Sequence, residues 1–279
     1  MRLSILAIVV TLTAPAFSQE PAFDVASVRP NVAGKTTEIR QTPNGRFSAT
    51  NASLRELILR AYGLHRSQIA GLPDWAETER YDIDARASSP PADGPEALLP
   101  MLRTLLVERF RLRARIEMRE LPAYVVVFSQ PDKRLGAQIR PTQADCTEGR
   151  VVTEEEIRAA ARDGWPPCGM VFVLSFTTGG PDGVVKMRLR RSAVAMPDFA
   201  RSLVNAVDRP VVDRTGLAGR YDIEYSYAPR PNAESTIAVA QNVPSLGAAL
   251  EEQLGLKLES ERTEVPVVVI ESVERPTEN

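Results

Sequence analysis

The chain has 279 residues, enough for one large domain or two small ones, and its hydrophobic content of 43% is ordinary for a folded protein. Its net charge of −2 leaves no basic surface large enough for a nucleic-acid partner. The single histidine excludes a His-rich metal site and would have to be the base of any Ser–His–Asp or Cys–His mechanism.

The first residues predict a signal peptide over residues 1–18. Arg2 supplies a positive start, residues 3–14 form an apolar run, and Ala16 and Ser18 place small residues before a cleavage site at Gln19. A membrane anchor is the alternative, but a spanning helix needs about 20 apolar residues, more than this run offers. We therefore expect export to the periplasm or the extracellular space, with no membrane span in the mature chain.

A first α+β unit is predicted over residues 19–130. Ser53 and Glu56 form a capping box at the start of a helix that Gly63 can end. The expected elements are strands at 23–28 and 46–50, this helix, a strand at 81–87, a helix carrying Leu102, Leu106 and Phe110, and two closing strands at 111–120 and 124–128. Alternation in the first closing strand predicts that Leu112, Ala114, Ile116 and Met118 face a core.

A polar linker over residues 131–169 carries the only two cysteines, Cys146 and Cys168. In an exported protein two cysteines most simply form one disulfide, here a staple that closes a loop. A redox pair or a metal-binding pair is the alternative. A short acidic helix is expected over 154–162 inside this linker.

A second α+β unit over residues 170–279 matches the first. Residues 102–127 align without a gap with residues 246–271, and eight of the 26 positions are identical. The segment Arg80-Tyr81-Asp82-Ile83 likewise returns as residues 220–223. The sequence thus predicts an α+β fold with mainly antiparallel sheets, built by duplication of a helix-strand-helix-strand-strand unit. In both copies the closing strands are joined by Glu-(Leu/Val)-Pro, a place where proline suits a strand start or a sheet edge.

No motif for a nucleophile, a metal or a phosphate is present, so we predict no catalytic residue, no metal site and no cofactor. Two acid pairs, Asp82 with Asp84 and Asp222 with Glu224, alternate along strands and therefore share a face. They could bind a cation or act as acid and base in a carboxylate-dependent hydrolase. A solvated strand face, repeated with the fold, is the other interpretation. His65 follows a helix end, where a surface turn is the favoured role.

Two turn-rich segments, 71–75 and 208–219, each precede an Arg-Tyr-Asp-Ile strand. They either order the entry to that strand or form a binding rim. The binding residues predicted on this basis are Asp74, Trp75, Arg80, Tyr81, Asp213, Arg220 and Tyr221.

The same segments carry a family resemblance, at 23–30, 45–47, 62–64, 73–75 with 80–83, 209–213 with 221–222, and 253–256 with 273–276. Over nearly the whole mature chain they resemble an acidobacterial family of uncharacterised secreted paralogues, a domain of unknown function also found fused to antibiotic-sensor-type membrane metallopeptidase regulators. The resemblance implies an envelope or exported location and no activity. We therefore predict a non-catalytic binding or protein-interaction module with an envelope protein or a small ligand as partner, the alternatives being a carboxylate-dependent envelope hydrolase and a self-assembling structural unit.

Overall fold

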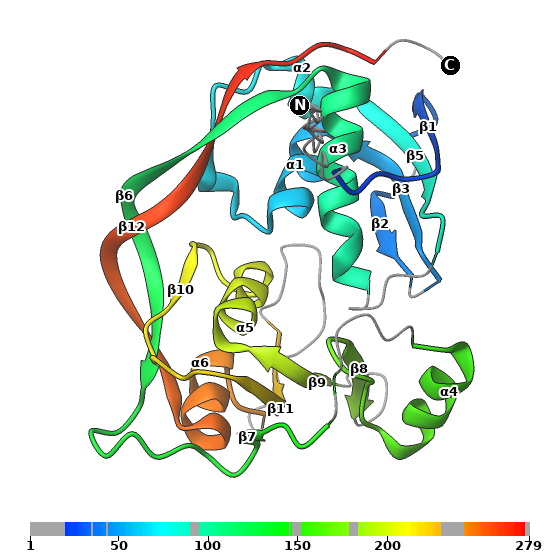
Figure 1. Cartoon of the computed structure of the whole chain (residues 1–279). Coiled ribbons are helices and arrows are strands. Elements are labelled where there is room, and N and C mark those ends of the chain that lie inside the picture. Colours follow the sequence, from blue (N-terminus) through cyan, green and yellow to red (C-terminus); the bar gives the residue numbers. More distant parts are fainter. Residues whose placement is uncertain are drawn as a thin grey trace, which may run out of the picture.

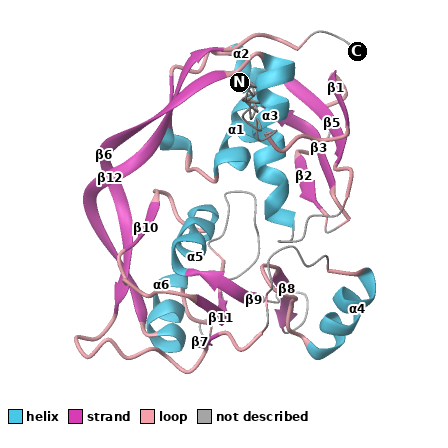
Figure 2. Cartoon of the chain, in the orientation of Figure 1, coloured by secondary structure: helices cyan, strands magenta, loops and turns pink. Residues whose placement is uncertain are grey.

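The computed structural model describes residues 20–34, 36–42, 44–89, 95–144, 146, 152–178, 184–229 and 243–276. Within these residues the chain forms three four-stranded sheets, in which most neighbouring strands are antiparallel. Two lobes, each a sheet with its helices, are joined along one side of the molecule by a long two-stranded ribbon (Figure 1). The predicted α+β class is confirmed, and strands and helices occur in both lobes (Figure 2).

Lobe one is a sheet in the order β1-β5-β3-β2 with its helices packed on one face. Ser53 and Glu56 form the predicted capping box, and Gly63 ends the helix in the left-handed conformation at φ 62°. The elements are β1 (Val25–Pro30), β2 (Glu38–Gln41), β3 (Arg46–Ser53), α1 (Leu54–Tyr62), η1 (Arg66–Gln68), α2 (Trp75–Thr78), β5 (Arg80–Arg86), η2 (Pro95–Ala97) and α3 (Leu98–Phe110).

Lobe two is a sheet in the order β7-β11-β9-β8, and its core gathers around Phe199, Ile223 and Leu254. The predicted acidic helix of the linker forms and begins at a Thr153 capping box. The elements are β7 (Ile139–Pro141), α4 (Glu154–Asp163), β8 (Val171–Thr178), β9 (Val184–Ala195), α5 (Met196–Ser202), η3 (Leu203–Asn205), β11 (Arg220–Tyr227), α6 (Leu246–Ala249) and the π-helical turn η4 (Leu250–Leu254).

The ribbon that joins the lobes consists of β6 (Arg113–Phe128) and β12 (Leu256–Ser272), which pair antiparallel along nearly their whole length. Each carries a short parallel neighbour, β10 (Val211–Asp213) on β6 and β4 (Ile69–Ala70) on β12. The division of each strand into two at the proline was wrong. The Tyr124 amide points toward β10 and therefore away from β12. Residues two apart in a strand point the same way, so the nitrogen of Pro122 also lies on the side away from β12. Its missing hydrogen therefore costs the ribbon no hydrogen bond.

Each ribbon strand starts in one lobe and ends in the other. The end of β12 places Val268 and Ile270 in the core of lobe one, while the end of β6 places Val126 in the core of lobe two. The core of each lobe therefore includes the end of a strand that begins in the other lobe. The division into units at 19–130, 131–169 and 170–279 stays a prediction.

Residues that align in the two halves of the sequence occupy matching places in the two lobes. Glu120 lies opposite Glu264, its aligned counterpart, at the middle of the ribbon. Beyond this point β10 joins β6 at Tyr124 just as β4 joins β12 at Val268. A local two-fold relation between the lobes is consistent with this pairing, and descent from a duplicated unit is our proposal for its origin.

The predicted inward face of β6 was wrong in its outer half. Leu112 is buried as expected, but Ile116 and Met118 are 62% and 56% exposed. Alternation places side chains on one face of a strand, yet only a second layer buries them, and here β6 has left lobe one to form the ribbon. The predicted signal peptide lies outside the described residues.

Candidate functional site

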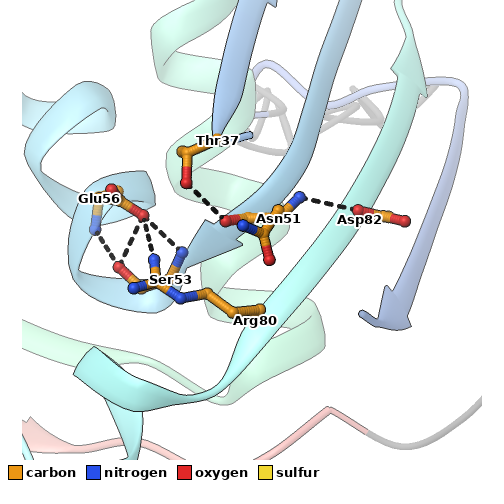
Figure 3. A network of polar contacts seen from close by, with 6 residues as sticks. All are labelled: Thr37, Asn51, Ser53, Glu56, Arg80 and Asp82. Carbon is orange, nitrogen blue, oxygen red and sulfur yellow. Dashed lines mark hydrogen bonds and ion pairs between the residues drawn. The ribbon is translucent and has the colours of Figure 1, made fainter. Parts of the chain in front are cut away.

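The Arg-Tyr-Asp-Ile strand of lobe one uses its polar groups to hold neighbouring backbone (Figure 3). Arg80 Nη1 lies 2.9 Å from Glu56 Oε2, which also accepts from the Ser53 amide at 2.7 Å. Asp82 Oδ1 accepts from the Asn51 amide at 2.8 Å, at a bulge where Asn51 has a φ of 52°. Two of the motif's charged side chains therefore order a helix start and a strand bulge.

Lobe two repeats this arrangement. Asp222 Oδ1 accepts from the amide of Ala193, which has a φ of 53° at the corresponding bulge. Arg220 donates to the Ala193 carbonyl at 3.0 Å, and the hydroxyl of the buried Tyr221 donates to the Ala218 carbonyl at 3.1 Å. The recurrence of the motif has a structural explanation, since both copies stabilise a left-handed residue in the preceding strand.

Tyr81 lies in a cluster that ties the end of the chain to lobe one. Its side chain is 2% exposed, and its hydroxyl donates to Glu79 at 2.8 Å. Burial and this carboxylate raise the pKa of Tyr81. Arg275 pairs with Glu79 at 2.7 Å and stands 4.8 Å from the Trp75 ring centroid, while Asp74 is exposed just before α2.

Asp213, the last predicted binding residue, closes a turn after β10. Its Oδ1 accepts from both the amide and the hydroxyl of Thr215, at 2.9 and 2.7 Å. Arg220 and Tyr221 therefore belong to lobe two and Asp213 to β10 on the ribbon, whereas Asp74, Trp75, Arg80 and Tyr81 belong to lobe one. The structure does not gather the seven predicted residues into one site, and most of their polar groups have partners within the chain.

The two acid pairs lie on different sheets, and their carboxylates are engaged. Asp84 pairs with Arg46 at 2.7 Å on lobe one. On lobe two Glu224 accepts from Arg188 and Arg190, at 2.5 and 2.8 Å. Burial alone would raise the pKa of Glu224, but these arginines outweigh it and lower that pKa. A carboxylate whose pKa is lowered by two arginines is poorly suited to donate a proton as the acid of a hydrolase.

His65 caps the short helix η1 at the side of lobe one that faces lobe two. Its Nδ1 lies 2.9 Å from the Ser67 hydroxyl. Burial and the nearby Arg66 lower the pKa of His65, while Asp208 of lobe two acts in the opposite direction. The histidine thus serves as a helix cap at the boundary between the lobes.

A polar group that the sequence analysis missed lies near this boundary, and we call it the interlobe cluster: Gln41, Arg60, Glu96, Arg191 and Asp198. Arg60 donates to Gln41 Oε1 and pairs with Glu96 at 2.9 Å, all within lobe one. From lobe two, Arg191 lies close enough to Arg60, Glu96 and Asp198 for their charges to act on it. Gln41, Arg60 and Glu96 thus contact one another in lobe one, and Arg191 and Asp198 of lobe two lie within range of their charges.

Arg191 differs from the other members because its guanidinium has no hydrogen-bond or ion-pair partner among the described residues. Its Nε is buried without a partner, as is Nε2 of Gln41. Glu96 is paired with Arg60, and Asp198 is paired with Arg201. Burial lowers the pKa of Arg191, because removal from water disfavours the cation.

The position of Arg191 in its sheet explains its burial. It lies opposite Ile223, and Leu189 on the same face of β9 lies opposite the buried Tyr225. Arg191 therefore extends the core-facing side of the strand, where the alternation of Met187 and Leu189 would place an apolar residue. A charged residue in that register was the one signal in the sequence for this site.

The predicted disulfide is confirmed, with Cys146 and Cys168 bonded at a Cα separation of 5.7 Å. Within the part of the chain that the structure describes, no group of three or more His, Cys, Asp or Glu side chains is placed to hold a metal ion. No helix in that part has both the length and the apolar character needed to cross a membrane.

Residues 55–273 match a family described as "Protein of unknown function (DUF3738)". This range covers lobe two, the ribbon and the helices and β5 of lobe one, whereas β1, β2 and β3 precede it. No curated protein and no solved structure matches the chain.

Proposed function

The chain belongs to the DUF3738 family, whose function is unknown, and from this premise we propose that it is an exported, non-catalytic binding protein. The proposed ligand group is an acid, a carboxylate or a phosphate, bound by the interlobe cluster. The observation that carries this proposal is the part-buried Arg191, whose guanidinium has no partner among the described residues.

The charges of the interlobe cluster favour an acidic group. Arg60 and Glu96 neutralise one another, and Arg201 neutralises Asp198, so the positive charge of Arg191 is in excess. The unpartnered Nε2 of Gln41 adds a second donor close to Arg60. An acid that accepted from both would remove the desolvation cost of two buried donors.

Binding at this place would also couple the two lobes. Gln41 and Arg60 belong to lobe one and Arg191 to lobe two, so one ligand would contact both. The family resemblance and the disulfide support export. The same proposal includes an origin among secreted acidobacterial paralogues and a kinship with sensor-fused domains.

A thermal-shift experiment on the exported form, from residue 19, tests the proposal. The probes are acetate, succinate, citrate and inorganic phosphate, with chloride at matched ionic strength as the blank. At a concentration of 100 times Kd, a ligand stabilises the folded state by about 2.7 kcal/mol. We expect a saturable rise in melting temperature with at least one acid, which Arg191→Met abolishes.

Arg188→Met is the matched control, because Arg188 stands on the same strand but already pairs with Glu224. It should keep the response to the acid. A response shared equally by the wild type, Arg191→Met and Arg188→Met would be a general salt effect and would contradict the proposal, as would no response to any acid.

Three other hypotheses follow from the sequence: a hydrolase, a binding rim and self-assembly. A carboxylate-dependent hydrolase would need a free acid and base within about 10 Å. The predicted acids lie on two separate sheets, where Asp84 and Glu224 pair with arginines and Asp82 accepts from the Asn51 amide. The predicted binding rim at Asp74 and Asp213 stays a proposal of second rank. Self-assembly is favoured by a separate observation on the ribbon.

A further inference from the structure

The outer edge of β6 combines free backbone groups with exposed apolar side chains. At the two ends of β10, the Tyr124 amide donates to the Pro210 carbonyl and the Val126 carbonyl accepts from the Arg214 amide. The Ser129 amide instead donates to the carbonyl of Gly255, just before β12. Even-numbered residues of β6 therefore point their backbone groups away from β12. β10 ends its pairing at Tyr124, so among the described strands none pairs with the edge that runs from Ala114 to Glu120.

Apolar side chains stand on this free edge. Ile116 and Met118 are 62% and 56% exposed and lie two residues apart, so they share one face of the strand. An unpaired edge with an apolar face is the arrangement that most readily adds another strand.

The aligned positions on β12 show the contrast within the same molecule. Ser260 and Arg262 align with Ile116 and Met118 and are exposed on the corresponding edge. They carry polar contacts, from Arg209 to Ser260 at 2.8 Å and from Arg262 to Glu120 at 2.8 Å. Only the β6 edge presents hydrocarbon where the matching edge presents polar groups.

We propose that two copies of this chain associate through their β6 edges, antiparallel and with Met118 opposite Met118 of the second copy. The ribbons would join into one four-stranded sheet in the order β12-β6-β6-β12. The middle of the ribbon lies on one side of the molecule, away from the sheets of both lobes, where a second copy can approach it (Figure 1).

The charges on β6 select this register. With Met118 at the two-fold axis, Glu117 faces Arg119 of the second copy and Arg119 faces Glu117, which gives two opposite-charge pairs. A shift that centres Glu117 would oppose Glu117 with Glu117 and Arg115 with Arg119. A shift that centres Arg119 would oppose Arg119 with Arg119. A shift that centres Ile116 would also oppose Arg115 with Glu117, but its two Arg113–Arg119 pairs would offset these two favourable pairs.

Cysteine cross-linking tests both the dimer and its register. The two cysteines of the chain are joined to one another, so Met118→Cys would introduce the only free thiol. Residues directly opposite in a hydrogen-bonded pair have Cα atoms about 5.5 Å apart, within the range of a disulfide. Ile116→Cys is the matched control, because the two copies of residue 116 would stand about 14 Å apart along the strands.

Under mild oxidation we expect Met118→Cys, and not Ile116→Cys, to give a covalent dimer. Sedimentation equilibrium of the uncross-linked wild type should show a reversible dimer. Met118→Lys should raise its dissociation constant at least tenfold, whereas Val25→Lys, on an exposed apolar residue of β1, should not change it. Arg119→Glu should weaken the dimer, and Glu117→Arg added to it should restore the dimer.

A wild-type protein that stays monomeric at several hundred micromolar would overturn the proposal. A dimer that Ile116→Cys cross-links as well as Met118→Cys, or that Val25→Lys disrupts as well as Met118→Lys, would overturn the assigned edge and register. None of these outcomes depends on an acid bound by the interlobe cluster, because no residue of that cluster is changed.

Discussion

Replacing Arg191 by methionine should stabilise the unliganded protein. Arg191 occupies a core-facing position of β9 opposite Ile223, and its buried Nε has no partner among the described residues. Methionine is of similar length, is apolar and adapts its shape to its surroundings. The substitution thus removes an uncompensated buried cation and leaves little cavity.

The size of the gain follows from the cost of burying a polar group without a partner, which is about 1–3 kcal/mol. Arg191 keeps part of its surface in contact with solvent, so we expect the lower half of that range, about 1–2 kcal/mol. For a protein of this size a change of 1 kcal/mol shifts the melting temperature by about 2–4 °C, so the variant should melt about 2–8 °C higher.

Urea unfolding followed by circular dichroism, without added acids, measures the change. Arg190→Met is the control and should destabilise the protein, because Arg190 hydrogen-bonds Glu224 at 2.8 Å and also contacts the Gly164 carbonyl. A loss of stability in Arg191→Met of more than about 1 kcal/mol, beyond the scatter of ordinary substitutions, would refute the reasoning. It would mean that Arg191 makes a stabilising contact of its own in the unliganded protein.

Three further predictions concern the framework around the site. Asp82→Ala and Asp222→Ala should each cost about 1–3 kcal/mol in urea unfolding, because each leaves a bulge amide without its acceptor; unchanged stability would contradict the assigned role. The double variant Cys146→Ser, Cys168→Ser should lower the free energy of unfolding by about 3 kcal/mol, because the disulfide no longer restricts the entropy of the unfolded loop. A urea midpoint equal to that of the wild type would contradict this. Because the pKa of His65 is lowered in the folded state, its contribution to the free energy of unfolding is fully present above pH 6.5 and is lost as the pH falls through the folded pKa. Between pH 7.5 and 5 the wild type should therefore lose more unfolding free energy than His65→Gln, and an equal loss in both proteins would contradict this.

The parts of the fold predicted correctly from the sequence are those set by local chemistry. The capping box of Ser53 and Glu56 determines where α1 begins, and the left-handed Gly63 where it ends. The disulfide followed from the presence of only two cysteines. Each of these signals lies within a few residues or in a simple count.

The errors concern what lies next to a strand rather than the strand itself. The alternation through Ile116 and Met118 identified a strand, but it carried no information on whether a second layer would cover that face. Pro122 does not interrupt the strand, because its nitrogen, which carries no hydrogen, lies on the side away from β12 and no ladder hydrogen bond is lost. Both outcomes depend on how the ribbon crosses between the lobes.

The candidate site could not be predicted because its members are far apart in the sequence. Gln41, Arg60 and Arg191 come from different elements of two lobes. The repeated Arg-Tyr-Asp-Ile segment is conspicuous in the sequence, but its charged side chains hold two strand bulges and a helix start. By contrast, Arg191 is marked only by a charge in an apolar register, a signal whose meaning depends on which face of β9 is buried.

The most direct test of the account is calorimetric titration of the most stabilising acid into the wild type and into Arg191→Met. The account predicts saturable binding of one acid per chain to the wild type and no measurable binding to the variant. Equal affinity for both proteins would contradict the assignment of the interlobe cluster as the binding site.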